Sequence, residues 1–295
     1  MGLALMRNTA TWFIGGAVVV LLVVAVADGI RGRAHASSST TPPPQVLRGV
    51  LVTADGACQT KAYRLPSMAV ERPQHPPDCN GLVWSQDGSL VARCNGDFTS
   101  MRSTEGVEFP NVNGCAPAWR ADGALSVILD GNIWVARRHG RPFVFFSRPQ
   151  LAGALRAAGV DHPDEWRFVQ VSWFGLTSFV AILQRPGDTA IAAFASGGVE
   201  TYLPHLGAHV EDLRASPNGN FAYAHVDPER EYVMVSRGGQ RISLPVVREA
   251  RAIAWSPDES YVAISNNSET VIARTGSTNV MTTLSFGANA LAWLT

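Results

Sequence analysis

Hydrophobic and polar positions follow one recurring pattern along most of the chain from Val46 onward. Each repeat has an apolar pair, usually a tryptophan, a short polar turn and a second apolar run, as in residues 82–92 and 253–263. Asp-Gly or Asn-Gly between two apolar runs is a strong β-hairpin signal. A third and a fourth apolar run follow the hairpin, for example at 132–136 and 142–146. The pattern therefore predicts a series of four-stranded antiparallel sheets.

The spacing of the repeats predicts the number of sheets. The tryptophan position recurs 35 to 54 residues apart, and the blades of a β-propeller take about 40–45 residues each. Residues 291–293 form a first strand without a second, whereas 50–52 and 58–65 resemble a second and a third strand. Pairing of these two regions would close a ring and protect the strand edges. We therefore predict an all-β fold, a six-bladed β-propeller of four-stranded antiparallel blades closed by pairing of its N- and C-terminal strands.

The repeated tryptophans and turn residues have a structural interpretation. Equivalent positions in successive blades favour packing between blades over a ligand cage, and Asp-Gly turns place glycine at positive φ. Glu259 stands where the other hairpins have glycine, which predicts backbone strain at that residue. The repeat position is occupied by Trp84, Trp119, Trp173, Ala215, Trp255 and Trp293.

Three of the turns carry a recognisable motif. Residues 255–258 read Trp-Ser-Pro-Asp, and residues 84–88 and 216–219 match the same pattern in part. These residues resemble the TolB-type six-bladed β-propeller, a WD-like repeat family whose repeats carry a Trp-Ser-Pro-Asp-Gly core. The resemblance covers roughly residues 46–295 and implies the fold, while the N-terminal α/β domain of that family has no counterpart here. Because turn and core residues make up the motif, no functional residue is transferred.

The N-terminal part has a different composition. Residues 8–27 carry no charged side chain, and a helix of this length covers the roughly 30 Å hydrocarbon core of a bilayer. We predict a short cytoplasmic tail at 1–11, a transmembrane helix at 12–27, a Ser/Thr/Pro-rich linker at 28–45 and the β-propeller at 46–295. A signal peptide cleaved after Ala27 or Ala36 is the alternative interpretation.

Four cysteines lie in two pairs with equal spacing. Cys58 and Cys79 are 21 residues apart, and so are Cys94 and Cys115. Strand counting places both members of each pair on the same rim of the propeller, so we predict disulfides Cys58–Cys79 and Cys94–Cys115. Four free thiols and a zinc site remain alternatives. Disulfides require an oxidising compartment, which favours a propeller outside the cell membrane with the N-terminus in the cytoplasm.

The longest interval between repeats holds an insertion at residues 148–166. Leu151 and Leu155 have helical spacing after Pro149, and Gly159 is a plausible stop. By strand counting this insertion shares a rim with the predicted disulfides, and loops on a rigid scaffold are common binding sites. A solvated loop is the alternative interpretation, and metal ligation at 205–212 is a further one. The candidate binding residues are His162, Asp164, Glu165, Trp166, His205, His209 and Glu211.

Charge and motifs limit the function classes. The 24 basic and 24 acidic side chains cancel, which argues against a nucleic-acid binder. The sequence has no Gly-x-Ser-x-Gly elbow, phosphate-binding glycine loop or His-Glu-x-x-His motif, so we assign no catalytic residue, metal or cofactor. We predict a non-enzymatic, membrane-tethered, extracytoplasmic binding module that docks a protein or peptide. The alternatives are a metal-dependent lactonase or lyase of the propeller type and a structural assembly factor of an envelope complex.

Overall fold

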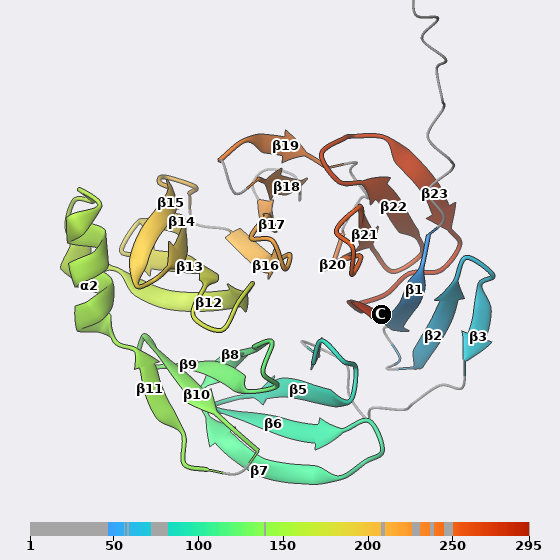
Figure 1. Ribbon diagram of the computed structural model, residues 1–295, viewed down its shortest axis with the longest axis horizontal. Coiled ribbons are helices and arrows are strands. Elements are labelled where there is room, and N and C mark those ends of the chain that lie inside the picture. Colours follow the sequence, from blue (N-terminus) through green and yellow to red (C-terminus); the bar gives the residue numbers. More distant parts are fainter. Residues whose placement is uncertain are drawn as a thin grey trace, which may run out of the picture. The chain divides into compact units, whose positions relative to one another are not determined.

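Six four-stranded sheets, the blades, lie around a common centre in the computed structural model (Figure 1). The first strand of each blade packs against the first strand of the next, so the first strands surround the centre. The chain divides into residues 1–45 and a unit of residues 46–295. The structure describes residues 47–55, 57, 59–71, 82–138, 140–207, 210–225, 231–236, 239–244 and 250–294. For these residues the predicted all-β fold with six antiparallel blades is confirmed.

Blades two to six each consist of four consecutive strands, paired in the order in which they occur along the chain. This is the predicted meander, and the observed strands agree with the apolar runs to within a few residues. The strands are, for blade two, β4 (Val83–Trp84), β5 (Leu90–Asn95), β6 (Phe98–Ser103) and β7 (Glu108–Asn113); for blade three, β8 (Cys115–Trp119), β9 (Leu125–Leu129), β10 (Asn132–Ala136) and β11 (Phe143–Phe146); for blade four, β12 (Arg167–Trp173), β13 (Phe179–Arg185), β14 (Asp188–Ala195) and β15 (Gly198–Leu203); for blade five, β16 (Val210–Ala215), β17 (Phe221–His225), β18 (Glu231–Val235) and β19 (Arg241–Ser243); and for blade six, β20 (Ala252–Trp255), β21 (Tyr261–Ser265), β22 (Thr270–Arg274) and β23 (Val280–Leu284).

Blade one contains strands from both ends of the propeller sequence. Its order is β24 (Ala290–Leu294), β1 (Gly49–Ala54), β2 (Thr60–Leu65) and β3 (Ala69–Glu71). Strands β24 and β1 pair antiparallel from Val50 opposite Leu294 to Ala54 opposite Ala290. The Trp293 indole Nε1–H donates to the Arg48 carbonyl oxygen at 2.9 Å. The predicted closure of the ring is therefore confirmed.

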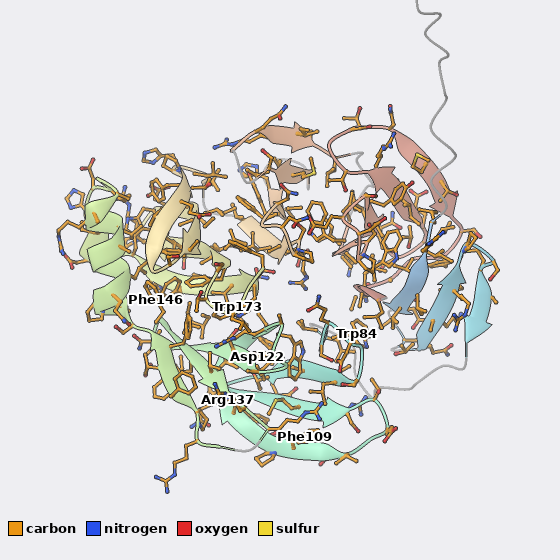
Figure 2. The ribbon with its side chains drawn as sticks, in the orientation of Figure 1. Trp84, Phe109, Asp122, Arg137, Phe146 and Trp173 are labelled. Atoms are coloured by element: carbon orange, nitrogen blue, oxygen red, sulfur yellow. A yellow bond between two sulfur atoms is a disulfide. The ribbon has the colours of Figure 1, made fainter. Side chains whose placement is uncertain are left out.

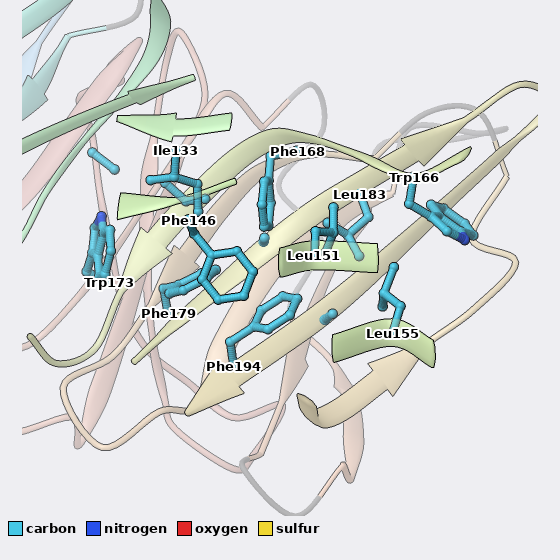
Figure 3. Close-up of a cluster of buried hydrophobic side chains, with 14 of the residues drawn as sticks. Ile133, Phe146, Leu151, Leu155, Trp166, Phe168, Trp173, Phe179, Leu183 and Phe194 are labelled. Atoms are coloured by element: carbon cyan, nitrogen blue, oxygen red, sulfur yellow. The ribbon is translucent and has the colours of Figure 1, made fainter. Parts of the chain in front are cut away.

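The largest cluster of buried apolar side chains among the described residues lies around blade four (Figure 3). Phe146, Phe168, Phe179 and Phe194 are buried there, and the rings of Phe179 and Phe194 stack with centroids 4.9 Å apart. Complete burial of one such side chain contributes about 1.5–3 kcal/mol. The cluster joins blades three and four and extends under the helix α2 (Arg148–Ala157). The buried side chains of the insertion therefore pack into the apolar cluster of blade four.

Two rims of the propeller differ in what they carry. The hairpin rim holds the turns between first and second strands, at residues 85–88, 120–123, 174–178, 216–219 and 256–259. The connector rim lies at the opposite ends of the same strands, where the last strand of one blade leads to the first strand of the next. Because adjacent strands run antiparallel, the insertion at 148–166 and the segment around His205 belong to the connector rim.

Serine and aspartate side chains hold the turns of the hairpin rim. The Ser85 hydroxyl donates to Asp87 at 2.6 Å and accepts from the Leu90 N–H at 2.9 Å. Blade six repeats this arrangement with Ser256 and Asp258. The Ser85 hydroxyl lowers the pKa of Asp87, because the bond favours the ionised carboxylate. The pKa of Asp258 is also lowered. Burial acts to raise this pKa, but the hydrogen bonds from Ser256 and Ser260 have the larger combined effect.

Glu259 occupies the left-handed position of its turn with a φ of 58°, so the predicted strain is confirmed. Its carboxylate is buried and faces the hairpin of blade five. It accepts hydrogen bonds from the Ser216 hydroxyl at 2.8 Å, from the Asn218 N–H and from the Asn220 amide. These bonds offset the strain and tie the two blades together.

The predicted tail, transmembrane helix and linker at 1–11, 12–27 and 28–45 lie outside the described residues. Among the residues that the structure describes, no helix combines the length and the apolar character needed to cross a membrane.

Candidate functional site

The insertion on the connector rim is a helix, as its spacing predicts. Ser147 caps α2 by accepting the Gln150 N–H, while the Gln150 side chain accepts the Ser147 N–H. This reciprocal arrangement is a capping box, and Pro149 suits the first turn because it has no N–H to satisfy there. Leu151 and Leu155 are fully buried against blade four. The helix is therefore anchored on one face and presents its other face to solvent.

The polar segment after the helix carries three of the candidate binding residues on its surface. Asp164 and Glu165 lie in the short 3₁₀ helix η1 (Pro163–Glu165), and His162 precedes it with a φ of 51°. The Arg156 guanidinium donates to both Asp164 oxygens, at 3.2 and 3.0 Å. The His162 ring lies 3.5 Å from Glu165. All these side chains are more than half exposed, so solvent screens their charges and a partner can reach them.

Trp166 differs from the other candidates because only 2 % of it is exposed. Its ring meets Tyr202 edge to face, and the Arg185 guanidinium lies over it at 4.8 Å. Burial raises the pKa of Tyr202, an effect that Arg185 partly counteracts. The Trp166 ring therefore belongs to the core that supports the insertion and does not lie on its accessible surface. Sequence alone placed it beside its exposed neighbours.

A charged chain connects the His205 segment to the insertion. The His205 Nδ1 lies 2.9 Å from Asp188, and Arg185 donates to the same carboxylate at 3.3 Å. Arg185 also reaches the Asp161 carbonyl oxygen at 3.5 Å. The side chain of His205 is 76 % exposed, whereas that of Asp188 is 13 % exposed. The two predicted segments therefore meet through Arg185 and Asp188, which come from the turn between β13 and β14 and which the sequence pattern did not single out.

Two of the remaining candidates cannot be placed in this group. His209 lies outside the described residues. Glu211 lies in β16 opposite Ala224, and its side chain is outside the described part. Within the described part of the chain, no three His, Cys, Asp or Glu side chains are grouped so as to hold a metal ion.

The predicted disulfide between Cys94 and Cys115 is present, with the two Cα atoms 5.1 Å apart. It joins the end of β5 to the start of β8, and so links blade two to blade three on the connector rim. The second predicted disulfide involves Cys58 and Cys79, which both lie outside the described residues.

The centre of the propeller holds a cavity of about 250 Å³ that opens toward the hairpin rim. The first strands of all six blades contribute to its wall. The tryptophans tie neighbouring blades together: the indole N–H of Trp119 donates to Val83, that of Trp173 to Ser126 and that of Trp255 to Arg214. The predicted inter-blade role is confirmed for these three tryptophans, whose side chains also line the cavity. Trp84 and Trp173, which are labelled in Figure 2, lie toward the centre of the propeller.

Blade five departs from this arrangement because Ala215 replaces the tryptophan. Of the described residues that line the cavity, only Arg214 carries a charge. Its side chain is half-buried and donates to the Leu213 carbonyl oxygen at 3.1 Å. The cavity is therefore an apolar space with a single cationic side chain in its wall.

Comparisons with known proteins identify the fold. No protein-family model matches the chain, and no curated protein matches it in sequence. Among solved structures, the chain is similar to the β-propeller domain of Cps50 (Swd1) from Myceliophteria thermophila, with 16 % identity, a TM-score of 0.50, and coverage of 85 % of this chain and 89 % of that one. It is also similar to TolB from Acinetobacter baumannii, with 14 % identity, a TM-score of 0.55, and coverage of 83 % of this chain and 66 % of TolB.

A third similar structure is apo AztD from Citrobacter koseri, with 8 % identity, a TM-score of 0.47, and coverage of 81 % of this chain and 82 % of that one. The likeness to the first two structures shows a shared propeller fold and, at these identities, nothing more. It includes both a TolB propeller and a propeller of the Cps50 (Swd1) type, which agrees with the repeat motif.

Proposed function

We propose that the protein is a non-enzymatic binding module whose connector rim docks a protein or peptide partner. The observation that carries this proposal is the construction of the insertion. Leu151, Leu155 and Trp166 anchor it in the core of blade four, while His162, Asp164 and Glu165 stand exposed above that anchor. Rigid support lowers the entropy that a surface loses on binding.

The chemistry of this surface suits a partner with basic and hydrogen-bonding groups. Carboxylates of Asp164 and Glu165 lie beside His162, and the partly buried Asp188 orients His205 nearby. The ion pair between Arg156 and Asp164 is exposed, so a partner's arginine or lysine can compete for the carboxylate at small cost.

Cross-linking of the full chain in intact cells tests the proposal. We expect a constant cross-linked partner for the unmodified protein and loss of that species in the double variant Asp164→Lys/Glu165→Lys. The matched control is Glu105→Lys/Glu108→Lys, which changes two exposed acids near the opposite rim by the same charge. Retention of the partner by the first variant, or equal loss in both, would exclude docking at the insertion.

We also propose that residues 12–27 tether the propeller to a membrane, with the propeller on the extracytoplasmic side. The charge-free stretch supports the tether, and the disulfide Cys94–Cys115 supports an oxidising compartment. Cell fractionation should find the full chain in the membrane pellet and a chain lacking 12–27 in the soluble fraction. In intact cells, Cys94 and Cys115 should resist thiol alkylation until a reductant is added; alkylation without reductant would contradict this location.

A further inference from the structure

A polar cleft lies on the hairpin rim, away from the insertion and beside the central cavity. It has a volume of about 770 Å³ and runs between the turns of blades two and three, at 85–87 and 120–124. Arg137 and Arg138, just after the end of β10, complete its wall. In Figure 2, Asp122 and Arg137 mark this cleft. Neither the repeat motif nor the predicted binding residues include it.

Arg120 forms a rigid cationic part of the wall. The residue is 8 % exposed, and its guanidinium packs against the rings of Phe145 and Trp173, 5.2 and 5.1 Å from their centroids. One of its terminal nitrogens lies 3.3 Å from Asp122. Its buried Nε has no hydrogen-bond partner among the described residues. Two aromatic faces and a carboxylate therefore hold this charge in place.

The acids of the cleft are held in an ion pair or in hydrogen bonds, whereas neither exposed arginine has an ion-pair partner among the described residues. Asp122 pairs with Arg120, and Asp87 accepts hydrogen bonds from the Ser85 and Ser89 hydroxyls. Arg138 lies over the Phe109 ring and makes one long contact of 3.5 Å to Ser89. Arg137 is exposed and has no ion-pair partner among the described residues. The cleft therefore has an excess of positive charge that faces solvent.

The cleft continues into the central cavity, because both are lined by Ser85, Gln86 and Ala121. On the cavity side the wall next to these shared residues includes Trp84 and Trp119. A ligand that lies across the shared residues would meet arginines at one end and tryptophan rings at the other. Arginine recognises carboxylates through paired N–H donors, and aromatic rings suit an apolar side chain.

We infer that this cleft binds an acidic peptide segment, with its carboxylates on Arg137 and Arg138 and an apolar side chain in the mouth of the central cavity. An extended segment fits better than a small anion, because the charged and the apolar walls adjoin but do not coincide. The cleft is separate from the insertion on the opposite rim. The experiments can therefore disprove peptide binding in the cleft without disproving partner docking at the insertion, and the reverse.

Fluorescence anisotropy with the full chain tests this inference. The probe is a dye-labelled peptide of alternating glutamate and leucine, and its partner probe has glutamine in place of glutamate. We expect saturable binding of the acidic peptide, which weakens with added salt, and no measurable binding of the neutral one. In Arg137→Glu/Arg138→Glu the acidic peptide should bind at least tenfold more weakly.

The matched control is Arg48→Glu/Arg241→Glu, in which two exposed arginines outside the cleft undergo the same change of charge. The affinity of this control variant for the acidic peptide should stay within about twofold of that of the unmodified protein. Equal weakening in both variants would mean general charge attraction and would overturn the inference. So would tight binding of the neutral peptide, full competition by inorganic phosphate at the concentration of the peptide, or no binding of the acidic peptide at millimolar concentration.

Discussion

The hairpin rim and the connector rim are built from opposite ends of the same strands, yet they follow different rules. On the hairpin rim, blades two and six repeat one set of hydrogen bonds within the turn, from Ser85 to Asp87 and from Ser256 to Asp258. On the connector rim each contact occurs once, such as the disulfide Cys94–Cys115 and the ion pair of Arg156 with Asp164. The comparison shows that repeated sequence encodes the scaffold, whereas single insertions create individual surfaces.

The largest expected effect concerns two glycines of the hairpin rim. Gly88 and Gly123 have φ angles of 70° and 75°, but a Cβ on Gly88 would meet the side chain of Leu294 in the closing strand, whereas one on Gly123 meets nothing within 4 Å. A side chain at either position would be strained by about 1–3 kcal/mol, and at Gly88 the end of the Leu294 side chain would also have to move, which adds about 1 kcal/mol. Gly88→Val should destabilise by about 3 kcal/mol and Gly123→Val by about 2 kcal/mol, measured by chemical denaturation. Equal losses would show that the closing strand does not constrain this turn.

The disulfide tests the connector rim, and its removal should lower the free energy of unfolding by a similar amount. Cys94 and Cys115 close a loop with a sequence separation of 21, which is worth about 3 kcal/mol in the chain-entropy model. Cys94→Ser/Cys115→Ser should lower the free energy of unfolding by about that amount. Reduction of the unmodified protein should cost at least as much, and any further loss on reduction of the double variant would report the second predicted disulfide, Cys58–Cys79. A double variant as stable as the parent would show that the disulfide does not support the rim.

Glu259 occupies a turn position that is glycine in other hairpins of this rim. Replacing it separates the cost of its backbone strain from the contribution of its hydrogen bonds to blade five. Glu259→Ala removes the acceptor of three hydrogen bonds from blade five and keeps the positive φ, so it should destabilise by about 2 kcal/mol. Glu259→Gly loses the same bonds but relieves the strain, so its loss should be smaller by about 1 kcal/mol. Thermal and chemical unfolding of both variants measure the difference. A glycine variant more stable than the parent would mean that the inter-blade bonds contribute nothing.

The smallest expected effect is a change in the pH dependence of the free energy of unfolding, caused by Asp87. The pKa of Asp87 is lower in the folded protein than its ordinary value, so its contribution is present above the unfolded pKa and is lost as the pH falls through the folded pKa. Asp87→Asn should therefore be less stable than the parent at neutral pH, and the gap should narrow between about pH 5 and pH 2. Ser85→Ala, which removes the hydroxyl that lowers this pKa, should flatten the same dependence. A gap that is constant with pH would contradict the assigned cause.

Much of the scaffold could be predicted because it depends on local rules that recur. The recurrence of six equivalent positions, five of them tryptophan, predicted the blades. The unfinished strand at 291–293 indicated closure, and Pro149, Leu151 and Leu155 predicted the helix. These features rest on periodicity and turn chemistry, which a sequence displays directly.

The sites could be predicted less well, because they depend on contacts between residues distant in sequence. Trp166 has acidic neighbours in sequence but is buried against Tyr202 and Arg185. Asp188 and Arg185 join the His205 segment to the insertion only after blade four has folded. The arginine cleft depends on Arg120 packing against two rings from two other elements, Phe145 of β11 and Trp173 of β12. No spacing along the chain indicates these contacts.

The seam between β24 and β1 has a consequence for biosynthesis. Trp293 and Arg48, which share a hydrogen bond across it, are 245 residues apart. During translation β1 leaves the ribosome long before β24. The edge of β1 that pairs with β24 therefore stays unpaired while blades two to six are made. Contacts of such large sequence separation form slowly, and exposed strand edges recruit other chains. The nascent protein should therefore depend on chaperones most strongly until β24 has been made, and a circular permutant that moves the seam into a blade connection should depend on them less.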